Sequence, residues 1–312
     1  MTRWIDRLTQ NGKFHPMWIV LAVTGVLIIG ALVLIPARYE GSKEPKQNVA
    51  IARKIPATSL PEPDAGQHES KQTAPSIQSA HFAPPSENDI PTGEMGDMIK
   101  LGRNIFVHTQ IYAKGLVGNG LNCVNCHLDA GRKADSAPLW AAYVMFPAYR
   151  SKNHKVNSFE DRLAGCFRFS MNGTPPEYNS KEMIALTSYS YWLATGAPLG
   201  KKLAGRGYPK LEKPPQSPDA QRGAAVFEKN CAICHGADGL GTKVNGQYAF
   251  PPLWGKDSYN AGAGMHSVKN AAAFIKANMP LGKGNSLSLQ EAWDVAQFVD
   301  SHDRPPDPRA KK

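Results

Sequence analysis

The pattern C-x-x-C-H occurs twice in this chain and constrains the fold more than any other sequence feature. The cysteines and histidines of the two copies are Cys123, Cys126 and His127, then Cys231, Cys234 and His235. Two thiols at this spacing can add to the two vinyl groups of one heme, and the histidine presents a ring nitrogen to the iron. A zinc site needs a second ligand pair nearby, and a redox dithiol needs a βαβ context, so neither explains the repeated histidine. The sequence therefore predicts two covalently bound heme c groups.

The segments around the two motifs also repeat. Ahead of each motif stands a glycine followed four residues later by an aromatic residue, Gly102 with Phe106 and Gly223 with Phe227. Such a glycine permits close contact between helices, and the aromatic ring fills the core. After each motif comes a helical pattern with a capping pair, Asn179 with Glu182 and Ser288 with Glu291. Little strand signal is visible, so we expect an all-α fold of two cytochrome c domains in tandem.

The length of 312 residues exceeds what one compact domain usually requires, and 42% hydrophobic with 20% charged residues is a globular composition. We expect, in chain order, a cytoplasmic stub with a transmembrane anchor (1–37), a disordered linker (38–97), a first heme domain (98–200), an interdomain linker (201–218), a second heme domain (219–305) and a tail (306–312). The first domain is expected to be catalytic, and the second to transfer electrons.

Met17 to Ile35 is an uncharged apolar run that is long enough as a helix to cross a bilayer. Three basic residues precede it against one acid, so the positive-inside rule places the N-terminus in the cytoplasm. The alternative is a cleaved signal peptide, whose apolar core is normally shorter and followed by a small-x-small site. We expect a single-pass inner-membrane protein whose heme domains lie in the periplasm.

The formal net charge of +10 is compatible with several anionic partners. Lysine and arginine are scattered along the chain, however, and no basic run interleaved with aromatic residues appears. We therefore expect no nucleic-acid partner.

Each iron also needs a distal ligand or an open position, which separates an electron carrier from an enzyme. In the second domain Met279 is the favoured ligand, because it follows an apolar helical stretch and precedes Pro280. Met265 is the rival candidate, but it sits in a glycine-rich stretch and is more simply an ordinary loop or core methionine.

The first domain holds Cys166, a cysteine that neither C-x-x-C-H motif uses. It could be a buried apolar residue or form an intermolecular disulfide. A third interpretation uses its neighbours, because Ser158 with Asp161 predicts a helix start. On that helix Arg162, Cys166 and Ser170 would share one face, bringing a cation, a thiolate and a hydroxyl together. A thiolate ligand would lower the potential of the first heme.

The chain resembles the thiosulfate dehydrogenase family, diheme cytochromes c that join two thiosulfates into tetrathionate. The resemblance covers roughly the last two-thirds of the chain and rests on several motifs. They are Leu121-Asn122-Cys123-Val124-Asn125-Cys126-His127 with Gly131-Arg132, Phe146-Pro147-Ala148-Tyr149-Arg150, Arg162 before Cys166, Ser170-Met171-Asn172-Gly173, and Phe274-Ile275-Lys276-Ala277-Asn278-Met279-Pro280. The segment from Phe146 to Gly173 is the most specific.

The resemblance implies roles for these residues. His127 and Cys166 would ligate the catalytic heme, and His235 and Met279 the heme from which electrons leave. Arg150, Arg162 and Ser170 would line the substrate pocket. Two departures are notable: family members are commonly soluble exported proteins, and some have an iron-binding lysine where this chain has Asn278.

The resemblance also implies a reaction, in which two thiosulfates give tetrathionate and two electrons pass to a cytochrome or a membrane redox complex. Cys166 could form a transient sulfur adduct or remain an iron ligand throughout. The competing hypotheses are tetrathionate reduction by the same site, and a membrane-anchored electron carrier that feeds a terminal oxidase. A pure carrier needs neither an anion pocket nor a thiolate ligand.

Overall fold

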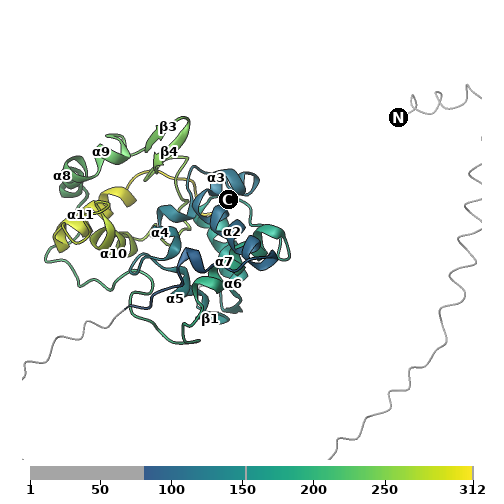
Figure 1. Ribbon diagram of the computed structural model, residues 1–312. Helices are drawn as coiled ribbons and strands as arrows, with labels where there is room; N and C mark the ends of the chain where they lie inside the picture. The colour runs from purple at the N-terminus through teal and green to yellow at the C-terminus, as the bar shows by residue number, and fades with distance from the viewer. Residues whose placement is uncertain (1–80, 152, 311–312) are drawn as a thin grey trace, which may run out of the picture. The chain divides into compact units, whose positions relative to one another are not determined.

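The computed structural model describes residues 81–151 and 153–310 (Figure 1). The apolar run from residue 17 to 35 and most of the expected linker 38–97 lie outside these residues. Among the helices of the described ranges, none is both long and apolar enough to cross a membrane.

The first heme domain is built around two helices, α2 (Glu94–Val107) and α7 (Lys181–Leu193), which lie side by side (Figure 1). Its other elements are η3 (Glu87–Asp89), α3 (Thr109–Tyr112), η4 (Lys114–Leu116), η5 (Cys123–Asn125), α4 (Leu128–Gly131), α5 (Leu139–Tyr143), β1 (Ala148–Arg150), β2 (Lys155–Asn157), α6 (Phe159–Gly165) and the π-helix η6 (Cys166–Ser170). Trp140, Phe167 and Tyr189 are the largest of its fully buried side chains. Burial of these rings stabilises the domain through the apolar area that they remove from water.

The second heme domain repeats this plan with fewer elements. They are α8 (Ala220–Asn230), α9 (Ala232–His235), β3 (Thr242–Val244), β4 (Gln247–Phe250), α10 (Val268–Asn278) and α11 (Leu289–Asp300). Helix α11 packs on both α8 and α10 (Figure 1). Phe227 of α8 lies in the core against Trp254 and Phe298, with ring centroids 5.2 and 5.4 Å away.

Each domain brings its first and last helices together at a glycine, as the sequence predicts. A Cβ atom at Gly102 would collide with the backbone carbonyl of Ala185 in α7. In the second domain, a Cβ atom at Gly223 would collide with the backbone carbonyl of Asp294 in α11. The same contact thus occurs in both domains, which confirms the two-domain cytochrome c architecture and explains why glycine stands at both positions.

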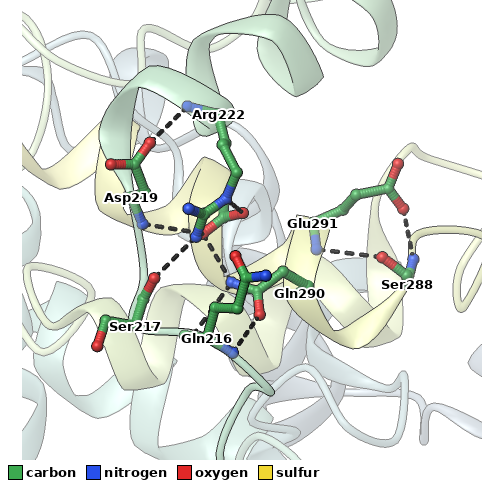
Figure 2. A network of polar contacts seen from close by, with 8 residues as sticks. Gln216, Ser217, Asp219, Arg222, Ser288, Gln290 and Glu291 are labelled. Atoms are coloured by element: carbon green, nitrogen blue, oxygen red, sulfur yellow. Dashed lines mark hydrogen bonds and ion pairs between the residues drawn. The ribbon is translucent and has the colours of Figure 1, made fainter.

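A polar network fixes the start of α8 on α11 (Figure 2). Arg222 holds the buried Asp294 carboxylate through two 2.8 Å hydrogen bonds, and the Asp219 backbone donates to the same carboxylate at 2.8 Å. Burial alone would raise the pKa of Asp294, but these donors outweigh it, and the pKa lies below its usual value. Gln290 also donates to Asp294, and it accepts from the Gln216 backbone at 2.8 Å. The end of the interdomain linker is therefore tied to the last helix.

Two short antiparallel hairpins correct the expectation of an all-α fold. Strand β1 pairs with β2, and β3 pairs with β4. Val244 pairs with Gln247, so Asn245-Gly246 forms a two-residue turn in which both residues have positive φ, 52° and 78°. Asn-Gly is a strong signal for such a turn, and the sequence analysis overlooked it because the strands are too short to show alternation.

The N-terminal boundary of the first domain also needs correction. Residues 81–97 were expected to belong to the disordered linker, but they pack on the domain. Phe82 lies against Trp140 with ring centroids 5.4 Å apart, and Arg132 donates to the backbone oxygens of Pro84 and Pro85 at 3.2 and 2.6 Å. Partners almost 50 residues away hold this segment, so no local periodicity reveals it.

The cap predicted for the last helix of each domain is present in the second domain but differs in the first. The predicted capping box of Ser288 with Glu291 is present at the start of α11. Helix α7, however, is capped by Ser180, whose hydroxyl accepts from the Met183 backbone at 3.2 Å, rather than by Asn179. Both residues are good cap formers, so the sequence alone fixes this start only to within one residue.

Two buried asparagines join the heme domains close to the π-helix. Asn119 donates to the backbone oxygens of Ser170 in the first domain and Ser258 in the second, at 2.8 and 3.2 Å. Asn260 of the second domain donates to the backbone oxygen of Arg168 at 2.8 Å. An apolar cluster made of Leu121, Met171, Tyr259 and Ala263 adjoins these bonds. The second domain thus supports the backbone that carries Cys166.

We expect Gly223→Ala to lower the free energy of unfolding by about 1–3 kcal/mol, because the added methyl group forces α8 away from α11. Alanine would otherwise favour the helix by up to about 1 kcal/mol. Thermal unfolding of the heme-loaded protein measures the change. Gly264→Ala is the control, since its methyl group meets open space and should shift stability by less than about 0.5 kcal/mol. Equal stability of the two variants would contradict the role of close helix contact.

Candidate active site

The first C-x-x-C-H motif begins on a short helical turn that holds both thiols on one side of the chain. Asn122 caps this turn by exchanging hydrogen bonds with Asn125, one of them 2.7 Å long. The buried Thr109 hydroxyl accepts from the Cys123 backbone at 3.1 Å and donates to its Sγ at 3.5 Å. None of the five cysteines, all of them described, is in a disulfide within the chain. The thiols of both motifs therefore fit covalent attachment of heme.

The histidines of the two motifs are oriented alike. Nδ1 of His127 lies 2.7 Å from the Ala137 carbonyl oxygen, and Nδ1 of His235 lies 2.8 Å from that of Pro251. Because a carbonyl only accepts, each Nδ1 carries the proton, and each Nε2 is left as a ligand atom. Burial, with a smaller effect of Arg162, lowers the pKa of His127 to about 4, and burial lowers that of His235. Both rings are thus neutral near pH 7, as iron ligation requires.

Cys166 lies where α6 ends and the π-helix begins. The predicted start of α6 is confirmed, since Ser158 and Asp161 form a capping box with bonds of 2.9 and 3.1 Å. One turn further on, the Arg162 guanidinium donates to Sγ of Cys166 at 3.3 Å. A cation in hydrogen-bond contact stabilises a thiolate over a thiol. The structure therefore brings together the cation and the sulfur atom that the sequence places on one helix face.

Arg150 reaches the same place from the end of β1. Partial burial lowers the pKa of its guanidinium, the neighbouring Arg162 lowers it further, and Cys166 acts in the opposite direction. These effects require the three side chains to be close together. The site therefore combines two arginines and one cysteine from separate elements, which suits an anion that carries sulfur.

Ser170 occupies a different position from the one that the spacing suggested. The expected α-helix gives way after Gly165 to the π-helix Cys166–Ser170, in which the Met171 backbone bonds to the Cys166 carbonyl at 3.0 Å. A π-helical turn is wider than an α-helical one, so the four-residue spacing no longer fixes a common face. Among the described residues, no hydrogen bond joins the Ser170 hydroxyl to Cys166 or Arg162. Ser170 remains a candidate, and its carbonyl is the group that Asn119 binds.

Tyr208 is a neighbour of the site that the sequence analysis missed. Burial raises the pKa of its phenol, with further effects from Cys126, Arg162 and Cys166. Its ring also lies edge-on to Phe274 of α10, with centroids 5.6 Å apart. Tyr208 therefore lies between the first heme motif and the second domain. It comes from the irregular interdomain linker, where no periodicity signals a buried residue.

The second domain offers the two methionines that the sequence proposed. Met279 follows the end of α10, and its backbone donates to Ile275 at 2.9 Å. Met265 instead packs against two clusters of buried apolar residues, one between the domains and one between α10 and α11. The packing of Met265 explains it as a core residue, which leaves Met279 as the stronger ligand candidate.

Two family descriptions match this chain, one for each domain. Residues 109–199 match the SoxA/TsdA cytochrome c domain, and residues 218–299 match the cytochrome c oxidase, cbb3-type, subunit III family. Both heme motifs lie inside these matches. The second description accords with a cytochrome c fold in an electron-transfer domain.

Relatives named thiosulfate dehydrogenase match most of the chain. The protein from Stutzerimonas stutzeri is 58% identical over 230 residues, which are 74% of this chain and 75% of that protein. The protein from Thiomonas intermedia is 61% identical over 230 residues, 74% of this chain and 73% of that protein. The solved structure of thiosulfate dehydrogenase (TsdBA) from Marichromatium purpuratum has a TM-score of 0.73 and 50% identity, and covers 77% of this chain. This chain spans about half of that longer one, 53%. Fold, heme motifs and sequence identity agree: the chain belongs to the thiosulfate dehydrogenase family and carries two covalently bound heme c groups.

Proposed function

We propose that this protein oxidises two thiosulfate anions to one tetrathionate and releases two electrons. The observation that carries the proposal is the hydrogen bond from Arg162 to Sγ of Cys166, with Arg150 near enough to feel the charges of both. The names of the relatives support the same substrate. When bound, each heme c accepts one electron, so the two hemes together can hold the electrons of one turnover.

The two arginines counter the main obstacle to this reaction. Two dianions repel each other strongly at the few Å that sulfur–sulfur bond formation requires. Planar guanidinium groups can hold sulfonate oxygens through paired hydrogen bonds while their charge offsets the repulsion. In the absence of substrate, partial burial and repulsion from Arg162 disfavour the charge on Arg150. An anion would relieve that repulsion, which favours binding.

Cys166 is the residue that places a sulfur atom of the protein in this site. Arg162 donates a hydrogen bond to its Sγ, and a thiolate in this position would be both the nucleophilic form and the electron-donating form of a ligand. Joining its sulfur to the outer sulfur of one thiosulfate would be an oxidation that releases two electrons, the number that the two bound hemes can take up. The second thiosulfate would then attack the thiosulfate-derived sulfur of this bond, forming tetrathionate and returning the Cys166 thiolate with no further change of oxidation state.

We further propose that electrons leave through the second domain to a cytochrome or a membrane redox complex in the periplasm. The N-terminal apolar run of the sequence would keep the protein at the inner membrane, near such an acceptor. His235, oriented by Pro251, and Met279 would ligate the iron from which the electrons leave. This His/Met pair raises the potential of that heme relative to a thiolate-ligated one, which favours electron flow from the first site to the second.

Cys166→Met should keep both hemes attached but lower tetrathionate formation by orders of magnitude. Methionine cannot act as a thiolate nucleophile, and as a ligand it would raise the potential of the first heme. Product formation with thiosulfate and an artificial acceptor measures the rate, and absorbance verifies heme content. Arg168→Gln is the control, because Arg168 is exposed on the same π-helix and should retain near-normal rates. Near-normal turnover by Cys166→Met would contradict a catalytic role of Cys166.

Met279→Ala should abolish the sulfur-to-iron charge-transfer absorption of the second heme, because it removes the proposed sulfur ligand. Met265→Ala should keep this absorption and lower stability, since it removes only core packing. The optical spectrum of each oxidised variant decides between them. The reverse pattern would reassign the ligand to Met265.

A further inference from the structure

Asn278 is the last residue of α10 and directly precedes Met279. Its side chain is completely buried, and Nδ2 donates in two directions. One hydrogen bond of 3.1 Å goes to Phe274 within α10, and one of 3.0 Å goes to the backbone oxygen of Asp135 in the first domain. The residue beside the proposed ligand of the second heme thus contacts the first heme domain directly.

The segment that Asn278 contacts, Asp135 to Ala137, carries the carbonyl that orients His127. That carbonyl belongs to Ala137 and lies 2.7 Å from Nδ1 of His127. Two residues of the segment have positive φ, 61° at Asp135 and 52° at Ala137, which non-glycine residues adopt only when their surroundings hold them.

Backbone hydrogen bonds to the interdomain linker fix this segment in part. The Asp135 amide donates to Gly205 at 2.7 Å, and the Ala137 amide donates to Gly207 at 2.7 Å. Asn278 adds a bond to the Asp135 oxygen from the second domain. The strained segment is therefore fixed from three sides: by the linker, by the second domain and by His127.

We propose that Asn278 is a positioning residue that couples the two heme sites. Its amide ties the turn that carries Met279 to the segment that sets the hydrogen bond of His127. The inference rests on the assignment of Met279 to the second heme under the proposed function. It differs from that function in predicting that a substitution in the second domain alters the first heme.

The chemistry of the amide supports this role over simple helix capping. Capping explains the bond to Phe274 but not the second bond to Asp135. The amide oxygen of Asn278 is also buried without a partner among the described residues, a cost that an apolar side chain of the same branching would not carry. An asparagine at this position weakens local packing but supplies a donor toward the other domain.

The test is Asn278→Leu, which removes both hydrogen bonds without changing charge and keeps the number and branching of the side-chain heavy atoms. Loss of the Asp135 bond should loosen the 135–137 segment and weaken the hydrogen bond that His127 donates. A weaker bond makes the imidazole a poorer electron donor, so the potential of the first heme should rise. Redox titration should show the higher potential of the first heme, and paramagnetic resonance of the oxidised protein should show a changed signal of that heme. Hydrogen exchange in the peptide spanning residues 133–138 should accelerate.

Lys276→Ala is the matched control. Lys276 also braces the turn around Met279, through a 2.9 Å bond to the Asn285 backbone, but this bond lies wholly within the second domain. The Lys276→Ala variant should leave the potential and resonance signal of the first heme unchanged, and also hydrogen exchange in the 133–138 peptide. If Asn278→Leu does not fold, Asn278→Ala removes the donor without adding bulk or charge, and the resonance and exchange measurements are repeated on it.

An unchanged resonance signal of the first heme and unchanged exchange in an Asn278 variant would overturn the proposal. So would an equal effect of Lys276→Ala. Both outcomes are distinct from failure of the proposed function, because that failure is the absence of tetrathionate formation by the wild-type protein.

Discussion

Each heme domain depends on one close contact between its first and last helices, at a position where only glycine fits. Gly102 brings α2 onto α7, and Gly223 brings α8 onto α11. The aromatic side chain four residues later, Phe106 or Phe227, then enters the core beside the heme motif. This pair of helices supports the C-x-x-C-H turn and its histidine. The same pair occurs in both domains, whereas the surroundings of the two heme motifs differ.

The difference between the domains lies in the π-helix that follows α6, because the described residues of the second domain contain no π-helix. Arg162 and Cys166 lie across the junction between these two helices, with Arg150 brought in by β1. The second domain contributes to this site although it holds none of these residues, because Asn260 bonds to the backbone of the π-helix. The Cys166 site in one domain and the heme motif of the other are thus linked by direct contacts, including the one from Asn278.

Much of the site was predictable because its chemistry follows short sequence spacings. The C-x-x-C-H motifs, the glycine contacts, and the pairing of Arg162 with Cys166 through one helical turn are all local patterns that the structure bears out. The capping box at Ser158 was equally local. Spacing was insufficient where the backbone departed from regular geometry, as in the π-helix that places Ser170 on a wider turn.

The remaining features depend on partners far apart in sequence. The order of residues 81–97 comes from contacts such as Phe82 with Trp140, which no periodicity encodes. Tyr208 lies near Cys166 because two domains meet at the linker, not because of its neighbours in sequence. The β3–β4 hairpin is an intermediate case, since its Asn245-Gly246 turn was a readable signal in strands too short to support it.

Product analysis of the wild-type protein tests most directly whether its site joins two sulfur anions. Purified, heme-loaded protein would be given thiosulfate and an artificial one-electron acceptor, and thiosulfate, tetrathionate and reduced acceptor would be quantified together. We expect one tetrathionate to appear and two acceptor molecules to be reduced for each two thiosulfates consumed. Failure to reduce the acceptor, or conversion of thiosulfate to sulfite or sulfate instead, would contradict this expectation.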